Sequence, residues 1–81
     1  PARETVHELR RAIAAGNPAE VKAHAHKLKS SSRTIGARRL ADICAAMEKA
    51  GKDEKMDELK SLQADFDGAM EKIEEFIREY V

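Results

Sequence analysis

The stretch GNPAEVKAHAHKLKSSSRTIGA, residues 16–37, specifies most of the topology because it holds the end of one helix, all of a second and the approach to a third. Gly16 is the residue type preferred just after a helix. Asn17 is a good N-cap, and Pro18 suits the first helical position. This succession predicts a tight turn between two antiparallel helices. Gly36 predicts the end of the second helix in the same way.

Apolar residues repeat at helical spacing on both sides of this stretch. The predicted helices cover residues 3–15, 18–34, 37–50 and 54–80. Their apolar faces are Val6, Leu9 and Ile13 in the first, Leu40, Ile43, Cys44 and Met47 in the third, and a heptad stripe from Leu59 to Tyr80 in the fourth. Short connections predict one all-α domain over residues 1–81, an antiparallel up-down-up-down four-helix bundle. Gly51 is expected to end the third helix, Asp53 to cap the fourth, and Gly68 to bend or break it.

Composition excludes several classes of protein. The 81 residues suffice for one small core, and no apolar run is long enough to cross a membrane. The single cysteine excludes an internal disulfide and favours a reducing compartment, so we expect a cytoplasmic protein. The net charge is zero, but residues 1–39 carry nine Lys/Arg against three Glu, and residues 40–81 carry six against twelve Asp/Glu. A basic first half that attracts an acidic partner is one interpretation, and attraction between helices of the bundle is the other.

One histidine of the second helix is predicted to face water. On a helical wheel the buried arc consists of Val21, Ala25, Leu28, Ser32 and Ile35. His26 lies about 140° from the centre of this arc. The cations Lys22, Lys29 and Arg33 lie on the same flank, and the small residues Ala23 and Ser30 leave the ring unobstructed. An exposed imidazole among cations and small residues is suited to accepting and returning a phosphoryl group.

The sequence resembles a known family through three features. They are the run His26-Lys27-Leu28-Lys29-Ser30-Ser31, the pair Gly36-Ala37 that follows it, and Leu40, Cys44 and Glu48 at spacings of four. The family is the histidine-containing phosphotransfer domain of bacterial multistep phosphorelays, which carries a His-x-Leu-Lys-small-Ser pattern. The family more often has glycine at the position of Ser30, and serine keeps that position small.

The resemblance implies that His26 accepts a phosphoryl group from an aspartate of a response-regulator receiver domain and passes it to another receiver. Lys29 would stabilise the phosphoryl oxygens. The implied receiver-binding surface consists of Lys22, Ala23, Lys27, Ser30 and Arg33. The domain is expected to bind no cofactor, with Mg²⁺ on the receiver, and to lack kinase activity of its own. It is expected to belong to a hybrid sensor histidine kinase.

Other candidates carry weaker signals. His24 is predicted at the edge of the core, and Cys44 is predicted to be a core thiol and not a nucleophile. Ser31 is left open as part of the site. No metal site is predicted, because His24 and His26 are two residues apart and diverge on a helix. The alternative function is a helical adaptor or nucleic-acid-binding bundle that uses the basic patch of Lys22, Lys27, Lys29, Arg33, Arg38 and Arg39.

The fourth predicted helix is much longer than the first. Its last apolar residues, Ile73, Phe76, Ile77 and Tyr80, therefore have nothing in residues 1–15 to cover them. A contiguous apolar stripe of this size is seldom exposed to solvent on a soluble monomer. Either an upstream helix covers it, which is the interpretation we favour, or two chains pair through it, or the chain turns back near Gly68.

Overall fold

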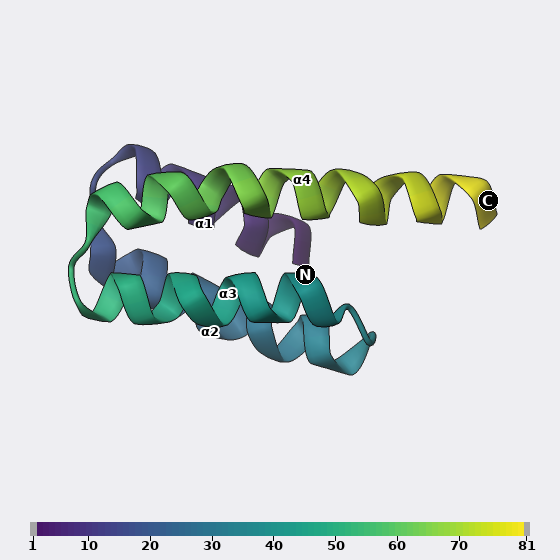
Figure 1. The fold of residues 1–81 in the computed structure, drawn as a ribbon, viewed down its shortest axis with the longest axis horizontal. Helices are drawn as coiled ribbons and strands as arrows, with labels where there is room; N and C mark the ends of the chain where they lie inside the picture. Colours follow the sequence, from purple (N-terminus) through teal and green to yellow (C-terminus); the bar gives the residue numbers. More distant parts are fainter. Residues whose placement is uncertain (1, 81) are drawn as a thin grey trace.

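The computed structural model describes the backbone of residues 2–80 and the side chains of residues 3–74. It contains four helices, α1 (Ala2–Ala14), α2 (Pro18–Thr34), α3 (Arg38–Lys52) and α4 (Met56–Tyr80). Successive helices pack against each other in a bundle, as Figure 1 shows. The all-α bundle predicted from the periodicity is confirmed. None of the described helices combines the length and the apolar character needed to cross a bilayer.

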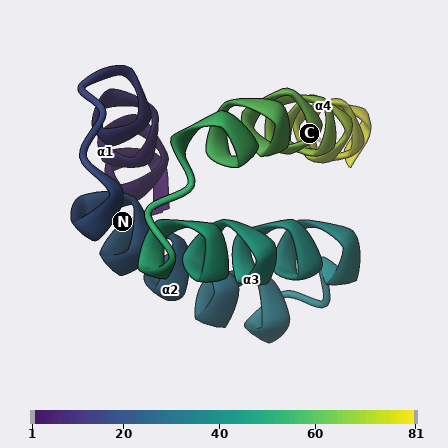
Figure 2. The same cartoon turned by 60° about the vertical axis from the view of Figure 1, so that its left-hand side comes forward.

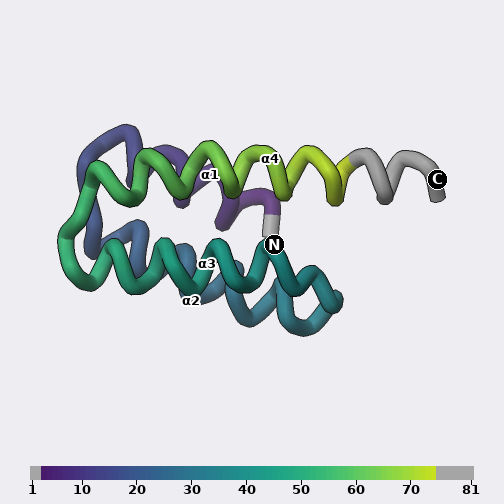
Figure 3. The backbone as a smooth tube through the Cα atoms, viewed as in Figure 1, coloured from purple at the N-terminus to yellow at the C-terminus, as the bar shows by residue number. Residues whose placement is uncertain are grey.

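The three turns, which can be followed along the backbone in Figure 3, share one hydrogen-bonding pattern. After α1 the Gly16 amide donates to the Ile13 carbonyl and the Asn17 amide to the Ala12 carbonyl. This pair of bonds is the Schellman motif, which places one residue in the left-handed region. Gly16 and Gly36 occupy that position with φ of +68° and +78°. The two glycines thus end α1 and α2 as predicted.

The third turn corrects two predictions. Its left-handed residue is Glu54, with φ of +56°, and the Glu54 amide donates to the carbonyl of Gly51. Gly51 therefore lies inside α3 and does not end it. Asp53 is the C-cap of α3 and not the N-cap of α4, which begins at Met56. The prediction failed because it took the nearest glycine as the stop, whereas the chain tolerates a strained glutamate three residues later.

Gly51 serves the packing of α3 against the start of α2. A Cβ atom on Gly51 would lie 2.8 Å from the carbonyl oxygen of Pro18 and 3.0 Å from the amide nitrogen of Lys22. Both atoms belong to the backbone, so they cannot move away as a flexible side chain would. The absence of a side chain therefore lets the end of α3 and the start of α2 approach closely here.

The core lies between the four helices and includes Phe66 and Leu59 of α4, Leu9 of α1 and Met47 of α3, all fully buried. From α2 it takes Val21, Ala25 and Leu28, as the helical wheel predicts, together with the buried hydroxyl residue Ser32. Ile35 was assigned to the same buried arc, and this is wrong, because it is 70% exposed. The helix ends at Thr34, so Ile35 leaves the helical path before it reaches the core.

Helix α4 has 25 residues and α1 has 13, so the two cover the α2–α3 layer unequally. Figure 2 shows α1 and α4 as two separate ridges above α2 and α3. They are joined by an ion pair between Arg10 and Asp67 at 2.9 Å, with the Arg10 guanidinium 5.7 Å from the centre of the Phe66 ring.

The predicted break at Gly68 is wrong, because α4 is one continuous helix. The side chains of Phe76, Ile77 and Tyr80 lie outside the described residues.

Candidate functional site

The outer face of α2 carries the residues that the sequence singled out. The side chain of His26 is 64% exposed, as its wheel position predicts. The predicted receiver-binding residues are also exposed, and they are Lys22, Ala23, Lys27, Ser30 and Arg33. Asn17 is the N-cap of α2. Its side-chain oxygen accepts a hydrogen bond from the Glu20 amide at 3.3 Å, and this bond determines where the helix begins.

One carboxylate of α3 joins His26 and Lys29. The Nδ1 atom of His26 lies 2.8 Å from Oε1 of Glu48. The Lys29 ammonium donates to both carboxylate oxygens, at 2.8 Å to Oε2 and 3.2 Å to Oε1. The side chains of Lys29 and Glu48 are only 18% and 19% exposed, so this part of the site is shielded from water while the imidazole is not.

The charge of Glu48 is stabilised by its two partners. Hydrogen bonds from Lys29 and then from His26 hold the pKa of this carboxyl below its ordinary value of 4.5, against the opposing effect of burial. Glu48 is therefore ionised near neutral pH and can only accept hydrogen bonds. The short contact to His26 then requires that Nδ1 carry a proton.

This requirement fixes the tautomer of the neutral imidazole ring. In a neutral ring with its proton on Nδ1, the other nitrogen, Nε2, keeps its lone pair. Among the described residues Nε2 has no hydrogen-bonding partner, and the ring is largely exposed. The arrangement thus presents a nucleophilic nitrogen to solvent on a ring whose orientation is fixed from behind by Glu48.

Three other candidates lie away from this group. His24 is half-buried on the other flank of α2, in keeping with its predicted place at the core edge. Ser31 lines a groove on that flank and is not beside His26. Cys44 is buried, and burial raises the pKa of its thiol to about 11, so it is a poor nucleophile near neutral pH. In the described part of the chain no three His, Cys, Asp or Glu side chains are placed to hold a metal ion.

Glu48 is the site residue whose role the sequence did not reveal. Its spacing of four from Cys44 was noted only as part of the family pattern. The helical wheel of α2 places cations around His26 but says nothing about which residue of α3 faces them. The one available signal for a contact between Glu48 and the cations around His26 was the presence of an acidic residue on the flank of α3 in a chain whose first half is basic.

The fold and the site define a four-helix bundle that presents one exposed histidine, with a half-buried glutamate and a half-buried lysine behind it. Residues 2–76 match the Hpt domain family, which is nearly the whole chain, and the protein belongs to this family. Hpt domains are phosphotransfer intermediates of phosphorelays, that is, phosphoryl carriers without kinase activity of their own, and their partners are receiver domains. Neither the curated proteins nor the solved structures compared with the chain gave a match. Of the two functions that the sequence left open, the family supports phosphotransfer.

Proposed function

We propose that His26 is the phosphoryl acceptor of this domain and that the group is carried on Nε2. The observation that carries the proposal is the 2.8 Å contact between Nδ1 and Glu48 on an otherwise exposed ring. This contact occupies one ring nitrogen and leaves the other free. Of the three histidines, His26 is the one with this arrangement among the described contacts.

The proposed transfer is a displacement at phosphorus. The Nε2 lone pair attacks the phosphorus atom of an aspartyl phosphate on a receiver domain, the N–P bond forms, and the P–O bond to the aspartate breaks. The aspartate leaves as a carboxylate, and the ring, still protonated on Nδ1, becomes positively charged. The Glu48 carboxylate at 2.8 Å from Nδ1 stabilises that charge as it develops. The reverse displacement hands the group to the next receiver and restores the neutral ring.

Lys29 has two roles in this proposal. It fixes Glu48 through two hydrogen bonds, which keeps the carboxylate ionised and aimed at the ring. It also places a positive charge one helical turn from His26, where it offsets the negative phosphoryl oxygens. The first role makes Lys29 a positioning residue, and the second is the one that the family resemblance implies.

We propose that the receiver docks on the exposed face of α2 around His26, over Ala23, Lys27, Ser30 and Arg33. All four are exposed, and the two small residues leave room for a receiver aspartate to reach the ring. The cations suit an acidic surface on the partner. A cytoplasmic location, where such receivers work, is part of the same proposal.

The experiment is transfer of labelled phosphate from phosphorylated receiver domains to the intact chain. We expect His26→Gln to abolish labelling and leave the melting temperature nearly unchanged, because the side chain is exposed. His24→Gln is the matched control and should be labelled like the parent. Label on the His26→Gln variant would refute the assignment of the acceptor.

Two further variants separate the roles within the site. Glu48→Gln keeps the size of the side chain and removes its charge, so the hydrogen bond that stabilises the developing ring charge is weakened and transfer should slow by roughly 10- to 100-fold, while the acid-labile product still forms on His26. Ser30→Trp should slow transfer by blocking the approach, with little loss of stability. An unchanged transfer rate in Glu48→Gln would contradict the role of Glu48 in orienting the ring. An unchanged rate in Ser30→Trp would contradict the proposed docking face.

A further inference from the structure

The Lys29 ammonium is already engaged on one side of the His26 ring. It donates to both oxygens of Glu48, at 2.8 and 3.2 Å, and its side chain is only 18% exposed. Glu48 contacts the ring at Nδ1. Because the two nitrogens of an imidazole ring point in diverging directions, a phosphoryl group on Nε2 extends away from this ammonium. Lys29 therefore acts on the phosphoryl group through its charge, and hydrogen bonds to the phosphoryl oxygens are left to other donors.

Helix geometry limits which residues of α2 can reach the phosphoryl group. On an α-helix the neighbours of a side chain are the side chains three and four positions away. For His26 these are Lys22, Ala23, Lys29 and Ser30. Ala23 has no polar side-chain atom, and Lys29 is held by the carboxylate behind the ring. The two donors that remain on this helix are Lys22, one turn before the histidine, and Ser30, one turn after it.

The Ser30 hydroxyl is available as a donor. The residue is exposed on the outer face of α2, and in the described part of the chain its hydroxyl makes no hydrogen bond. Its backbone carbonyl, by contrast, accepts a hydrogen bond of 3.0 Å from the Thr34 hydroxyl. Side chains of an α-helix lean toward its N-terminus, so the Ser30 side chain leans toward the turn that carries His26. Glycine, which the family more often has at this position, would supply no donor.

Lys22 is an exposed cation without a carboxylate partner among the described side chains. Its side chain starts at the contact between α2 and α3, because its Cβ atom would lie 3.2 Å from a Cβ atom added to Gly51. Gly51 follows Glu48 by three residues on α3, so Lys22 starts on the flank of α2 that Glu48 contacts. A flexible four-carbon stem lets its ammonium reach across one helical turn, to a group on the exposed side of His26.

We infer that the phosphoryl group on Nε2 of His26 is held by two donors, the Lys22 ammonium and the Ser30 hydroxyl. The inference rests on the proposed function and adds which residues bind the group that His26 carries. Both contacts exist only in the phosphorylated chain, because their acceptors are the phosphoryl oxygens. They therefore stabilise phosphohistidine relative to the free imidazole and shift the equilibrium of transfer toward this domain. Residues that only dock the receiver change the rate of transfer and leave this equilibrium unchanged.

Competition between two chains for the phosphoryl group measures this equilibrium without a contribution from docking. Parent and variant chains, equimolar and distinguished in mass by ¹⁵N labelling of one of them, are mixed with a trace of a receiver domain that phosphorylates the parent. The receiver moves the group between the two chains until its distribution is constant, and mass spectrometry of the intact proteins gives the ratio. Because the same receiver serves both chains, its own affinity for the group cancels from this ratio.

We expect the phosphoryl group to favour the parent over either variant that lacks a donor. Lys22→Met keeps the stem beside Gly51 and removes the charge, which should shift the ratio by roughly threefold. Ser30→Ala removes the hydroxyl and keeps the carbonyl that Thr34 contacts, and it should also shift the ratio by roughly threefold. The double variant should reach roughly tenfold. Added salt should reduce the effect of Lys22→Met but not that of Ser30→Ala, because salt screens exposed charges.

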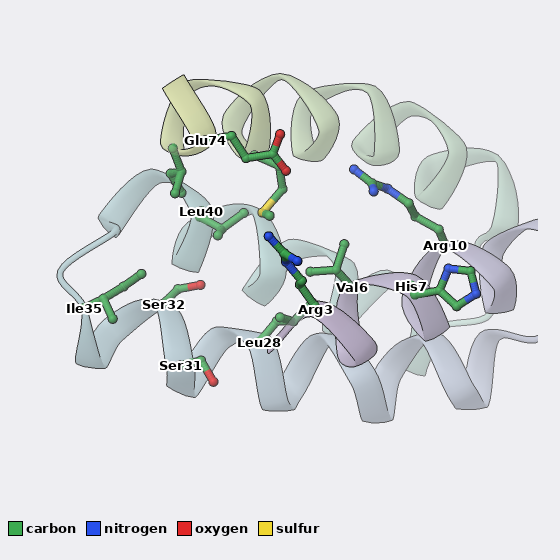
Figure 4. A pocket seen from close by; sticks show the side chains of 12 residues that line it. Arg3, Val6, His7, Arg10, Leu28, Ser31, Ser32, Ile35, Leu40 and Glu74 are labelled. Atoms are coloured by element: carbon green, nitrogen blue, oxygen red, sulfur yellow. The ribbon is translucent and has the colours of Figure 1, made fainter. Parts of the chain in front are cut away.

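Two control variants remove the same chemical groups from positions that do not face the phosphoryl group. Lys27→Met removes a charge from the same helix, at a position about 100° around α2 from His26. Ser31→Ala removes a hydroxyl from the other flank, where Ser31 lines the groove between α1 and α4 that Figure 4 shows. Both controls should give a ratio near one.

A ratio near one for Lys22→Met or for Ser30→Ala would overturn the assignment of that donor. A ratio for Lys27→Met as large as that for Lys22→Met would also overturn the contact with Lys22, because the general positive charge of α2 would then account for the effect. A parent chain that no receiver phosphorylates would instead refute the proposed function, so the two failures are distinguishable.

Discussion

Replacing Gly51 by alanine should destabilise the bundle, although alanine is the better helix former. The added Cβ would lie 2.8 Å from the Pro18 oxygen, closer than real Cβ atoms come, and 3.0 Å from the Lys22 nitrogen, which is tighter than most real Cβ contacts. Because both atoms are backbone, α2 and α3 must separate or shift along each other. Such overpacking costs about 1–3 kcal/mol.

The magnitude follows from two opposing effects. Alanine gains about 1 kcal/mol of helix propensity over glycine in a helix interior. With contacts this short the clash lies toward the upper end of its range, so the net loss should be roughly 1–2 kcal/mol. Gly68 provides the matched control, because it lies in α4 and a Cβ atom added there would meet nothing within 4 Å. Gly68→Ala should therefore stabilise the protein by about 0.5–1 kcal/mol.

Thermal unfolding followed by circular dichroism measures both variants. For a domain of this size about 1 kcal/mol corresponds to roughly 4–8 °C in Tm. Gly51→Ala should melt below the parent and Gly68→Ala above it. A Gly51→Ala variant that melts as high as Gly68→Ala would show that α2 and α3 do not approach as closely as described, and the reasoning about their packing would be refuted.

Three further outcomes follow from single residues. Glu54→Gly should raise the free energy of unfolding by roughly 0.5 kcal/mol in urea titrations, because Glu54 holds φ of +56° and glycine adopts that conformation without strain; a loss of stability would contradict the strain. Cys44 should resist alkylation at pH 8 in the folded protein and react once it is unfolded, because it is buried and its pKa is raised to about 11; rapid native labelling detected by mass would argue against burial. The pKa of Glu48 is lowered on folding, so its stabilisation is present above its ordinary value of 4.5 and is lost as pH falls through the lower folded value. The melting temperature of the parent should therefore exceed that of Glu48→Gln near pH 7 and approach it in acid, and a gap that does not change with pH would contradict the ion-pair role.

Local sequence signals predicted the helices and the exposure of the candidate histidine. Gly16 and Asn17 specify their turn through backbone conformation and capping, both of which depend on neighbouring residues alone. The position of His26 follows from its spacing relative to Val21 and Leu28 on a single helix. Neither inference required knowledge of how the helices pack.

The errors arose where packing between helices decides the outcome. Gly51 looked like a helix stop, but its lack of a side chain is used for the contact with Pro18. Ile35 looked buried, because the wheel extended α2 by one residue more than the chain does. Glu48 could not be assigned to His26, because the alignment of α3 along α2 depends on tertiary contacts such as the one at Gly51.

The ring nitrogen that bears the phosphoryl group decides whether His26 and Glu48 work together as proposed. After transfer from a phosphorylated receiver, NMR of the protein with ¹⁵N-labelled histidine reports which ring nitrogen is bonded to phosphorus. We expect one phosphorylated residue, His26, with coupling to phosphorus at Nε2 and the proton retained on Nδ1 beside Glu48. A phosphoryl group on Nδ1 of His26, or on His24 or His7, would contradict the proposed site.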